Sequence, residues 1–338
     1  MIRFLENYSL QPHNTFGVKA NAKYFFEFTE LEDLEIFLHS NKTWKDEKII
    51  MLGEGSNILF LKDFNGLVIH PNIRGLHLVN EDRQNIWMEV GAGENWDEFV
   101  QYCVNAQLGG VENLAFIPGA VGAAPVQNIG AYGQEVGDVV AKVKGYDLNK
   151  QRFVEYSNKE CQFSYRNSIF KSKLKNQFVI LSVVFQLEKF PEFNLNYKKL
   201  EQKVTEYGEI NLQNIRQAVI DIRSEKLPDV NFIGSAGSFF KNPVVDVATA
   251  EKIEVEFKDM PVFKTDEEKA KLAAGWLIEK AGWKGFREGD LGVHEKQALV
   301  IVNYGNATGM DIYNLSEKIK QSVFKKFGVE LEREVNCV

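Results

Sequence analysis

Hydrophobic and polar positions along the first 70 residues follow two patterns, one typical of strands and one typical of a helix. Short apolar runs predict strands at residues 24–28, 49–52, 58–60 and 67–69. Between the first two runs, apolar residues recur at helical spacing after Thr29, a residue type typical of helix N-caps: Leu31, Leu34, Phe37 and Leu38. The opening section is therefore expected to be a small α/β unit.

From about residue 73 the pattern predicts a mixed α+β section. Strands are expected at residues 86–90, 139–148, 152–156 and 178–187. An amphipathic helix is expected from Trp96 to about Ala106, and a second helix, carrying Ile215, Val219 and Ile222, ends near Ser224. The pair Leu227-Pro228 closes this section.

The last section combines helices with short strands. Helices are expected at residues 247–257, 271–281 and 311–327, with a charged surface loop running through Lys269 and a strand at residues 298–303. A terminal strand at residues 329–335 would place Glu330, Glu332 and Glu334 on one face, because side chains alternate along a strand. The chain shows no repeats or long linkers, so close-packed domains are expected.

Composition excludes several classes of protein. The 338 residues are too many for one small core, and 44% apolar with 26% charged residues is ordinary for a globular protein. A net charge of −7 without a basic stripe argues against nucleic-acid binding. No window approaches the roughly 18–20 apolar residues of a membrane span. Three distant cysteines and five scattered histidines indicate neither disulfides nor a metal site, and the start lacks a signal peptide, so a cytoplasmic protein is expected.

Two stretches are rich in glycine, so they offer main-chain groups with few large side chains around them. Residues 53–57 (Gly-Glu-Gly-Ser-Asn) form a turn directly after a predicted strand, but Ile58 stands where a Rossmann fingerprint needs glycine. The turn is either a plain connection or an anion-binding nest of N–H groups. Residues 109–133 are glycine-rich and nearly uncharged, which predicts buried backbone. Together the two stretches suggest the walls of a site for a long, diphosphate-containing cofactor.

Three polar groups are candidates for chemistry. Ser238 lies in a stretch of small residues before two phenylalanines, which is either a proton-transfer loop or a tight turn with a capping serine. Arg166 lies between aromatic residues and could hold a carboxylate in two bonds or form a structural ion pair. A terminal-strand glutamate aimed into a pocket would have a raised pKa and could act as an acid.

These stretches occur in an order that resembles the UDP-N-acetylenolpyruvoylglucosamine reductase family, the bacterial flavoenzymes of peptidoglycan precursor synthesis. The resemblance covers nearly the whole chain and is carried by Asn14–Gly17, Gly53–Asn57, Ile117–Gly119, Gln127–Gly133, Tyr165–Phe170, Lys226–Pro228, Gly237–Pro243 and Glu332–Val335. The Tyr197 segment and the loop near Pro261 resemble the longer, type I form of the family.

The resemblance implies a fold and a domain division. The fold is a vanillyl-alcohol-oxidase-like, α+β FAD-binding fold made of two subdomains (1–72 and 73–228), followed by an α/β substrate-binding domain (229–327). Residues 328–338 would return to the first subdomain. By resemblance, FAD contacts are expected from Gly53, Glu54, Gly55, Ser56, Asn57, Ile117, Pro118, Gly119, Gly122, Ala123, Ala124, Ile129, Gly130 and Tyr132.

The resemblance also implies a reaction: UDP-N-acetylmuramate dehydrogenase activity, in which NADPH reduces FAD and FAD reduces C3 of the enolpyruvyl ether. Ser238 would protonate C2, and Arg166 and Glu334 would stabilise the enolate-like intermediate. Substrate or NADPH contacts are implied for Tyr197, Lys226, Asn242, Phe263 and Gln297. Physical chemistry supports these roles, because charge that develops at C2 must be held by fixed positive or hydrogen-bonding groups. A monomeric, cytoplasmic enzyme that serves cell-wall biogenesis, cell shape and division is expected.

The sequence departs from the family pattern at two positions. Phe263 stands where a tyrosine near the diphosphate is usual, which removes a phosphate hydrogen bond, and Arg333 stands where proline is frequent. Two other function classes stay open from the residues alone: an oxidase of the same FAD-binding fold, and a nucleotide-binding module without catalysis. The serine loop and the terminal glutamates argue against the oxidase, and the presence of the serine, the arginine and the glutamate together argues against the module.

Overall fold

The structure is a computed structural model that describes residues 2–40, 43–264 and 268–338. The chain forms two compact units. Unit 1 contains residues Met1–Tyr8, Ala22–Glu54 and Asn65–Arg223, and unit 2 contains Ser9–Asn21, Gly55–Phe64 and Ser224–Val338. The chain therefore passes between the units several times. The finer, three-part division expected from the sequence stays a prediction.

A four-stranded sheet opens the chain. Its strands lie in the order β1 (Ile2–Ser9), β2 (Asn21–Phe28), β5 (Phe64–Pro71) and β3 (Ile49–Met51), and β3 pairs parallel with β5. Helix α1 (Leu31–Ser40) buries Leu34, Phe37 and Leu38 as expected, whereas Leu31 is exposed. Aromatic packing dominates this core, in which the rings of Phe26 and Phe37 stack with centroids 3.8 Å apart.

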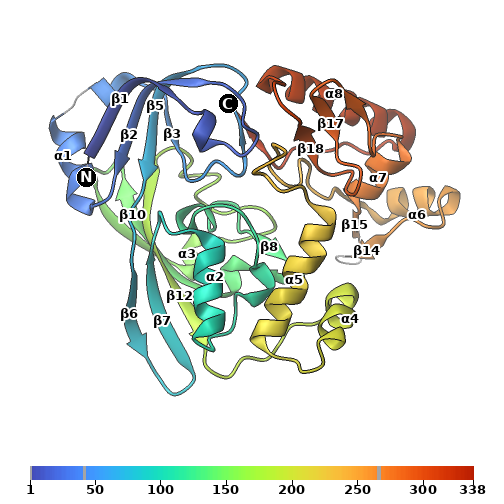
Figure 1. Ribbon diagram of the computed structural model, residues 1–338, viewed down its shortest axis with the longest axis horizontal. Coiled ribbons are helices and arrows are strands. Elements are labelled where there is room, and N and C mark those ends of the chain that lie inside the picture. Colours follow the sequence, from blue (N-terminus) through green and yellow to red (C-terminus); the bar gives the residue numbers. More distant parts are fainter. Residues whose placement is uncertain (1, 41–42, 265–267) are drawn as a thin grey trace. The chain divides into compact units, whose positions relative to one another are not determined.

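The second sheet of unit 1 has five antiparallel strands (Figure 1). Their order is β11 (Arg152–Ser157), β10 (Val140–Asp147), β12 (Phe178–Glu188), β7 (Asn85–Gly91) and β6 (Leu76–Glu81). β12 is rich in valine and isoleucine and is buried along most of its length, as expected for a central strand. A second core joins this sheet to α2 (Trp96–Asn105), α4 (Lys198–Glu206) and α5 (Leu212–Lys226).

In the part that the structure describes, unit 2 combines small sheets with the helices α6, α7 and α8. Two three-stranded sheets have the orders β13–β15–β14 and β16–β17–β18, and β19 pairs parallel with β4. The longest helix, α8, begins with a capping box of Thr308 and Asp311 and ends at Gly328, whose φ of 68° suits glycine. The bounds are β4 (Ile58–Leu59), β13 (Val244–Asp246), α6 (Val247–Glu256), β14 (Val262–Lys264), β15 (Lys269–Leu272), α7 (Ala274–Lys280), β16 (Arg287–Glu288), β17 (Leu291–Val293), β18 (Ile301–Asn303), α8 (Gly309–Phe327) and β19 (Asn336–Cys337).

Two expectations for unit 2 were wrong. Residues 329–335 form no continuous strand; a single bridge joins Arg333 to Phe240, and regular pairing begins at Asn336. Residues 271–272 belong to β15, so α7 begins later than expected, and the charged stretch before it carries β14 and the start of β15. Part of that stretch, residues 265–267, lies outside the described residues.

Short elements complete unit 1. α3 (Asn158–Cys161) follows β11, and a two-stranded hairpin pairs β8 (Gly130–Ala131) with β9 (Gln134–Glu135). Single helical turns are η1 (Gln11–His13) of unit 2 and, in unit 1, η2 (Thr43–Asp46), η3 (Glu112–Leu114), η4 (Val121–Ala123) and η5 (Val136–Asp138). Residues 109–133, expected to be buried backbone, are buried or half-buried except at Phe116, Pro118 and Gly133.

Candidate active site

The turn at residues 53–57 lies where the chain leaves unit 1 for unit 2. The Oε1 of Glu54 accepts a hydrogen bond from Asn95 Nδ2 at 2.9 Å, and the carbonyl of Gly55 accepts the Thr15 amide at 3.2 Å. Within the described residues, the main-chain N–H groups of Gly53, Glu54 and Ser56 donate to no protein acceptor. Successive unused donors in one turn suit an anion such as a pyrophosphate.

The second backbone-rich stretch lies directly against this turn. A Cβ added to Gly53 would lie 3.4 Å from the Cβ of Ala120 and 3.5 Å from that of Ala123. Ala120 is also bridged to Asn95, the residue that holds Glu54. The structure thus brings together the two stretches that the sequence singled out, and a wall of glycine and alanine with free N–H groups fits the diphosphate of FAD.

Arg166 is held in a strained conformation in unit 1. Its φ is 53°, a left-handed value that few residues other than glycine adopt, and Tyr132 and Asn128 in the neighbouring stretch share this feature. The guanidinium Nη2 donates to the carbonyl of Gly130 at 2.7 Å, and Cζ lies 5.3 Å from the ring centroid of Tyr165. A Cβ on Gly130 would lie 2.9 Å from Arg166 Nη1. Glycine at this position therefore leaves room for the guanidinium.

The serine loop of unit 2 is fixed before Ser238 by main-chain hydrogen bonds. Gly234 exchanges two with Asn303, at 2.9 and 2.8 Å, and the Ser235 amide donates to the Thr15 carbonyl at 3.0 Å. A Cβ on Gly234 would lie 2.2 Å from the carbonyl oxygen of Phe16, so glycine is required here. Ser238 itself is half-buried and lies outside regular secondary structure.

The loop is fixed again immediately after Ser238. The Phe239 amide donates to Leu299 O at 2.8 Å, and the Glu334 amide donates to Phe239 O at 2.9 Å. Lys241 N donates to Glu332 O at 2.9 Å, and the side chains of these two residues form an ion pair. Unit 2 therefore places the main chain next to Ser238 beside the terminal segment.

The three terminal glutamates differ in exposure. Glu330 and Glu332 are exposed, whereas Glu334 is half-buried. The Glu334 carbonyl accepts a hydrogen bond from Asn57 Nδ2 at 3.4 Å, which links the terminal segment to the glycine-rich turn. Among the candidate catalytic residues, unit 2 thus brings Ser238 and Glu334 together, and Arg166 belongs to unit 1.

Comparison with known proteins adds a decisive observation. Residues 24–149 match the model of an FAD binding domain, and residues 228–338 match the C-terminal domain of UDP-N-acetylenolpyruvoylglucosamine reductase. A Flavobacterium johnsoniae protein of that name is 44% identical, with 98% of each chain covered, and one from Pseudomonas putida is 42% identical, with 99% of each covered. The chain belongs to the UDP-N-acetylenolpyruvoylglucosamine reductase family.

The fold of this family is confirmed as well. The crystal structure of UDP-N-acetylenolpyruvylglucosamine reductase (MurB) from Thermus caldophilus superposes with a TM-score of 0.68 at 23% identity, covering 100% of this chain and 98% of the other. The chain is thus an FAD-dependent oxidoreductase with the expected α+β, vanillyl-alcohol-oxidase-type FAD-binding fold.

Two expected substrate contacts of unit 2 lie near the start of α7. Asn242 Oδ1 accepts the Ala274 amide at 3.0 Å, so this side chain also caps the helix. Gln297 Oε1 would lie 3.0 Å from a Cβ on Gly275 in the same helix. Phe263 lies on β14 opposite Lys271 and is exposed, and Lys226 ends α5.

In unit 1, Tyr197 precedes α4, and its ring meets that of Tyr132 edge to face, with centroids 5.2 Å apart. Sequence reasoning missed Asn113, a fully buried residue whose side chain contacts the segments of both tyrosines. Its signal was a polar residue, next to the likewise buried Glu112, inside a mostly apolar stretch. Arg223 was also missed; its Nε donates to the Phe116 carbonyl at 3.0 Å, and burial lowers the pKa of its guanidinium.

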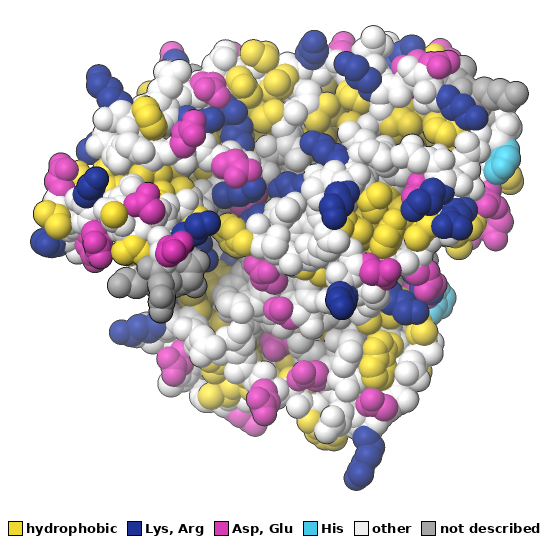
Figure 2. Space-filling view, turned by 180° about the vertical axis from the view of Figure 1, so that it is seen from behind, with side chains coloured by type: hydrophobic (Ala, Val, Ile, Leu, Met, Phe, Trp, Pro, Cys, Tyr) yellow, Lys and Arg dark blue, Asp and Glu magenta, His cyan; other side chains and the backbone are white. Residues whose placement is uncertain are grey.

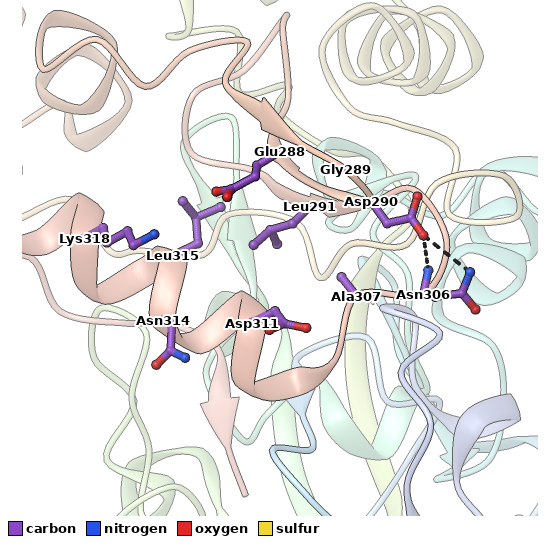
Figure 3. A pocket seen from close by; sticks show the side chains of 10 residues that line it. All are labelled: Glu288, Gly289, Asp290, Leu291, Asn306, Ala307, Asp311, Asn314, Leu315 and Lys318. Atoms are coloured by element: carbon purple, nitrogen blue, oxygen red, sulfur yellow. Dashed lines mark hydrogen bonds between the residues drawn. The ribbon is translucent and has the colours of Figure 1, made fainter.

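A hollow of about 900 Å³ in unit 2 lies elsewhere (Figure 3). It lies between β17 and α8 and contains none of the expected site residues. Two of its carboxylates have structural roles: Asp290 accepts from the amide and Nδ2 of Asn306, and Asp311 caps α8.

In the part of the chain that the structure describes, no three His, Cys, Asp or Glu side chains gather in a way that could hold a metal ion. Acidic and basic side chains are interspersed on the face that Figure 2 shows. None of the described helices is long and apolar enough to cross a bilayer.

Proposed function

We propose that this chain reduces the enolpyruvyl ether of UDP-N-acetylglucosamine enolpyruvate to UDP-N-acetylmuramate, with NADPH as the electron donor. The relatives that match over nearly their whole length carry the name of this reductase. The observation that carries the proposal is the double fixation of the serine loop, because the Phe239 amide and carbonyl are both engaged directly after Ser238. These bonds fix the main chain from which the Ser238 side chain leaves the loop.

The proposed roles follow from what each side chain can do. When bound, FAD supplies hydride transfer from NADPH to C3 of the ether. The Ser238 Oγ–H donates its proton to C2, forming the C–H bond, and the serine recovers a proton from water. The Arg166 guanidinium holds the substrate carboxylate and the negative charge shared with C2. A protonated Glu334 donates a hydrogen bond to the same charge.

Positioned donors act without reorganising, which makes them effective at a developing charge. Arg166 fits this requirement because its backbone conformation, its bond to Gly130 and its contact with Tyr165 fix the start and the end of the side chain. Ser238 fits because main-chain hydrogen bonds fix its loop at Gly234 and Ser235 before it and at Phe239 after it. Tyr197, Lys226, Asn242, Phe263 and Gln297 are proposed to contact the substrate or NADPH.

We also propose that the enzyme works as a cytoplasmic monomer that supplies peptidoglycan precursors. Phe263 has no hydroxyl, so the diphosphate should lack one hydrogen bond that a tyrosine would give.

An anaerobic two-step experiment tests the function. NADPH should bleach the flavin absorbance of the purified holoenzyme, and the enolpyruvyl sugar should restore it with formation of the muramate product. Reoxidation by oxygen but not by the sugar would identify an oxidase instead. Bound flavin that neither NADPH nor any UDP-sugar affects would identify a non-catalytic module.

A further inference from the structure

The side-chain amide of Asn113 joins two segments of unit 1. Its Nδ2 donates to the carbonyl oxygen of Tyr132 at 3.0 Å and to that of Asn194 at 2.8 Å. Asn113 is 0% exposed. Both partners are carbonyl oxygens, which only accept hydrogen bonds, so the NH2 group of the side-chain amide must face them. The orientation of this amide is therefore fixed.

The two joined segments carry a pair of tyrosines. The Tyr132 and Tyr197 rings meet at 85° with centroids 5.2 Å apart. Tyr132 has a φ of 48°, which a residue other than glycine adopts only when its surroundings enforce it. Tyr197 is 43% exposed, so burial alone does not fix its ring.

A second hydrogen bond joins the same segments. Asn194 Nδ2 donates to the Gly133 carbonyl at 3.0 Å, one residue beyond Tyr132. Asn113 also leaves its Oδ1 buried without a partner among the described residues. Burying an unpaired amide oxygen is unfavourable, so an apolar side chain would fill this space better if packing were its only purpose.

We propose that Asn113 is a positioning residue for the substrate. Through two main-chain carbonyls it sets the distance between the Tyr132 turn and the segment that leads to Tyr197, and so directs the Tyr197 ring. The inference rests on the proposed function, in which Tyr197 contacts the substrate. Asn113 is buried and acts only through these segments.

A double-mutant cycle on the holoenzyme tests this role. Asn113→Ala should raise KM for the enolpyruvyl sugar roughly five- to thirtyfold, the loss expected for one or two ordinary hydrogen bonds. The rate of flavin reduction by NADPH should stay nearly unchanged. In the Tyr197→Ala background the same substitution should have no further effect on KM, because the ring that Asn113 directs is then absent.

Asn158, an exposed residue, provides a control with the same hydrogen-bond pattern. Its Nδ2 also bridges two main-chain carbonyls, those of Gly137 and Val140, both at 2.7 Å. Asn158→Ala should lower the melting temperature without changing KM. Hydrogen–deuterium exchange gives a readout independent of turnover: Asn113→Ala should speed exchange in residues 194–200, and Asn158→Ala should not.

Three results would overturn the inference and leave the proposed function intact. They are additive KM effects in the double variant, an equal KM rise in Asn158→Ala, or unchanged exchange in residues 194–200. If Tyr197→Ala alone leaves KM unchanged, the proposed substrate contact is wrong, and the inference falls with it. Should Asn113→Ala not fold, Asn194→Ala removes the parallel bond to Gly133 and must raise KM in the same direction.

Discussion

The main-chain amide of Glu334 donates a hydrogen bond to the carbonyl oxygen of Phe239, with N and O 2.9 Å apart. Ser238 directly precedes Phe239 in the chain. The hydrogen bond therefore joins Glu334 to the residue next to Ser238, and both Ser238 and Glu334 are proposed catalytic residues. Their separation in sequence is 96 positions, from 238 to 334. The terminal segment therefore takes part in building the serine loop.

Replacing Arg166 by lysine should not be conservative. Lysine keeps the charge but loses the planar fork that can hold a carboxylate in two bonds. We expect the turnover number to fall about 10²–10³-fold, the usual cost of losing one fixed donor at a developing charge. FAD should stay bound, as judged by its absorbance. Arg152→Lys, at an exposed arginine of β11, is the control, and an unchanged turnover number in Arg166→Lys would mean that Arg166 is structural.

A methyl group at Gly234 should disturb the serine loop. Because the new Cβ would lie 2.2 Å from the Phe16 carbonyl oxygen, the backbone must shift, and such overpacking costs about 1–3 kcal/mol. Gly234→Ala should therefore lower both the free energy of unfolding and the turnover number.

Gly208→Ala separates this clash from backbone strain. Gly208 has a φ of 92° but no atom within 4 Å of an added Cβ. Its substitution should cost stability and leave turnover intact. Equal losses of turnover in the two variants, measured alongside chemical denaturation, would show that the contact with Phe16 does not position the loop.

Stability should depend on pH through His294. Burial lowers the pKa of this imidazole, and Lys296 adds to that effect while Glu295 opposes it. The unfolded chain, with a histidine pKa of about 6.5, then binds a proton that the folded chain resists. The free energy of unfolding should therefore fall as pH drops through that value, until the folded pKa is reached.

Substituting His294 by glutamine should flatten this part of the pH profile. His39→Gln, at an exposed residue of α1, is the control for the substitution itself. Denaturant titrations between about pH 5 and 8 provide the comparison. Identical profiles for wild type and His294→Gln would contradict the assigned cause.

The sequence revealed strongly patterned elements and missed weakly patterned ones. β12 and α8 were predicted because apolar residues mark their buried faces. β6 was missed because nearly all of it is exposed, so its apolar residues show no alternation. Buried and exposed residues do alternate from Val329 to Glu332, as they would in a strand. That alternation could not show that the segment pairs with the serine loop only through one bridge, at Arg333.

The candidate site divides in a similar way. Glycine-rich turns and a serine loop could be found as local motifs. The contact between Gly53 and Ala120, and the support of Ser238 by Leu299 and Glu334, depend on tertiary pairing that no local pattern encodes. Asn113 was missed for the same reason, because its partners lie 19 and 81 positions away.

Ser238 is proposed to protonate C2. Ser238→Ala should leave FAD binding and flavin reduction by NADPH nearly intact, whereas reoxidation by the enolpyruvyl sugar should slow by about 10²–10⁴-fold, the usual worth of a positioned general acid. That range corresponds to roughly 3–5 kcal/mol of barrier. Ser238→Cys should recover part of the rate, since a thiol can still donate a proton.

Stopped-flow flavin absorbance, recorded separately for the two half-reactions of the Ser238→Ala holoenzyme, is the most direct measurement. A normal bleaching phase with NADPH and a collapsed recovery phase with the enolpyruvyl sugar are expected. Equal losses in both phases would show that Ser238 serves structure or shared binding, and would contradict the proposed proton transfer.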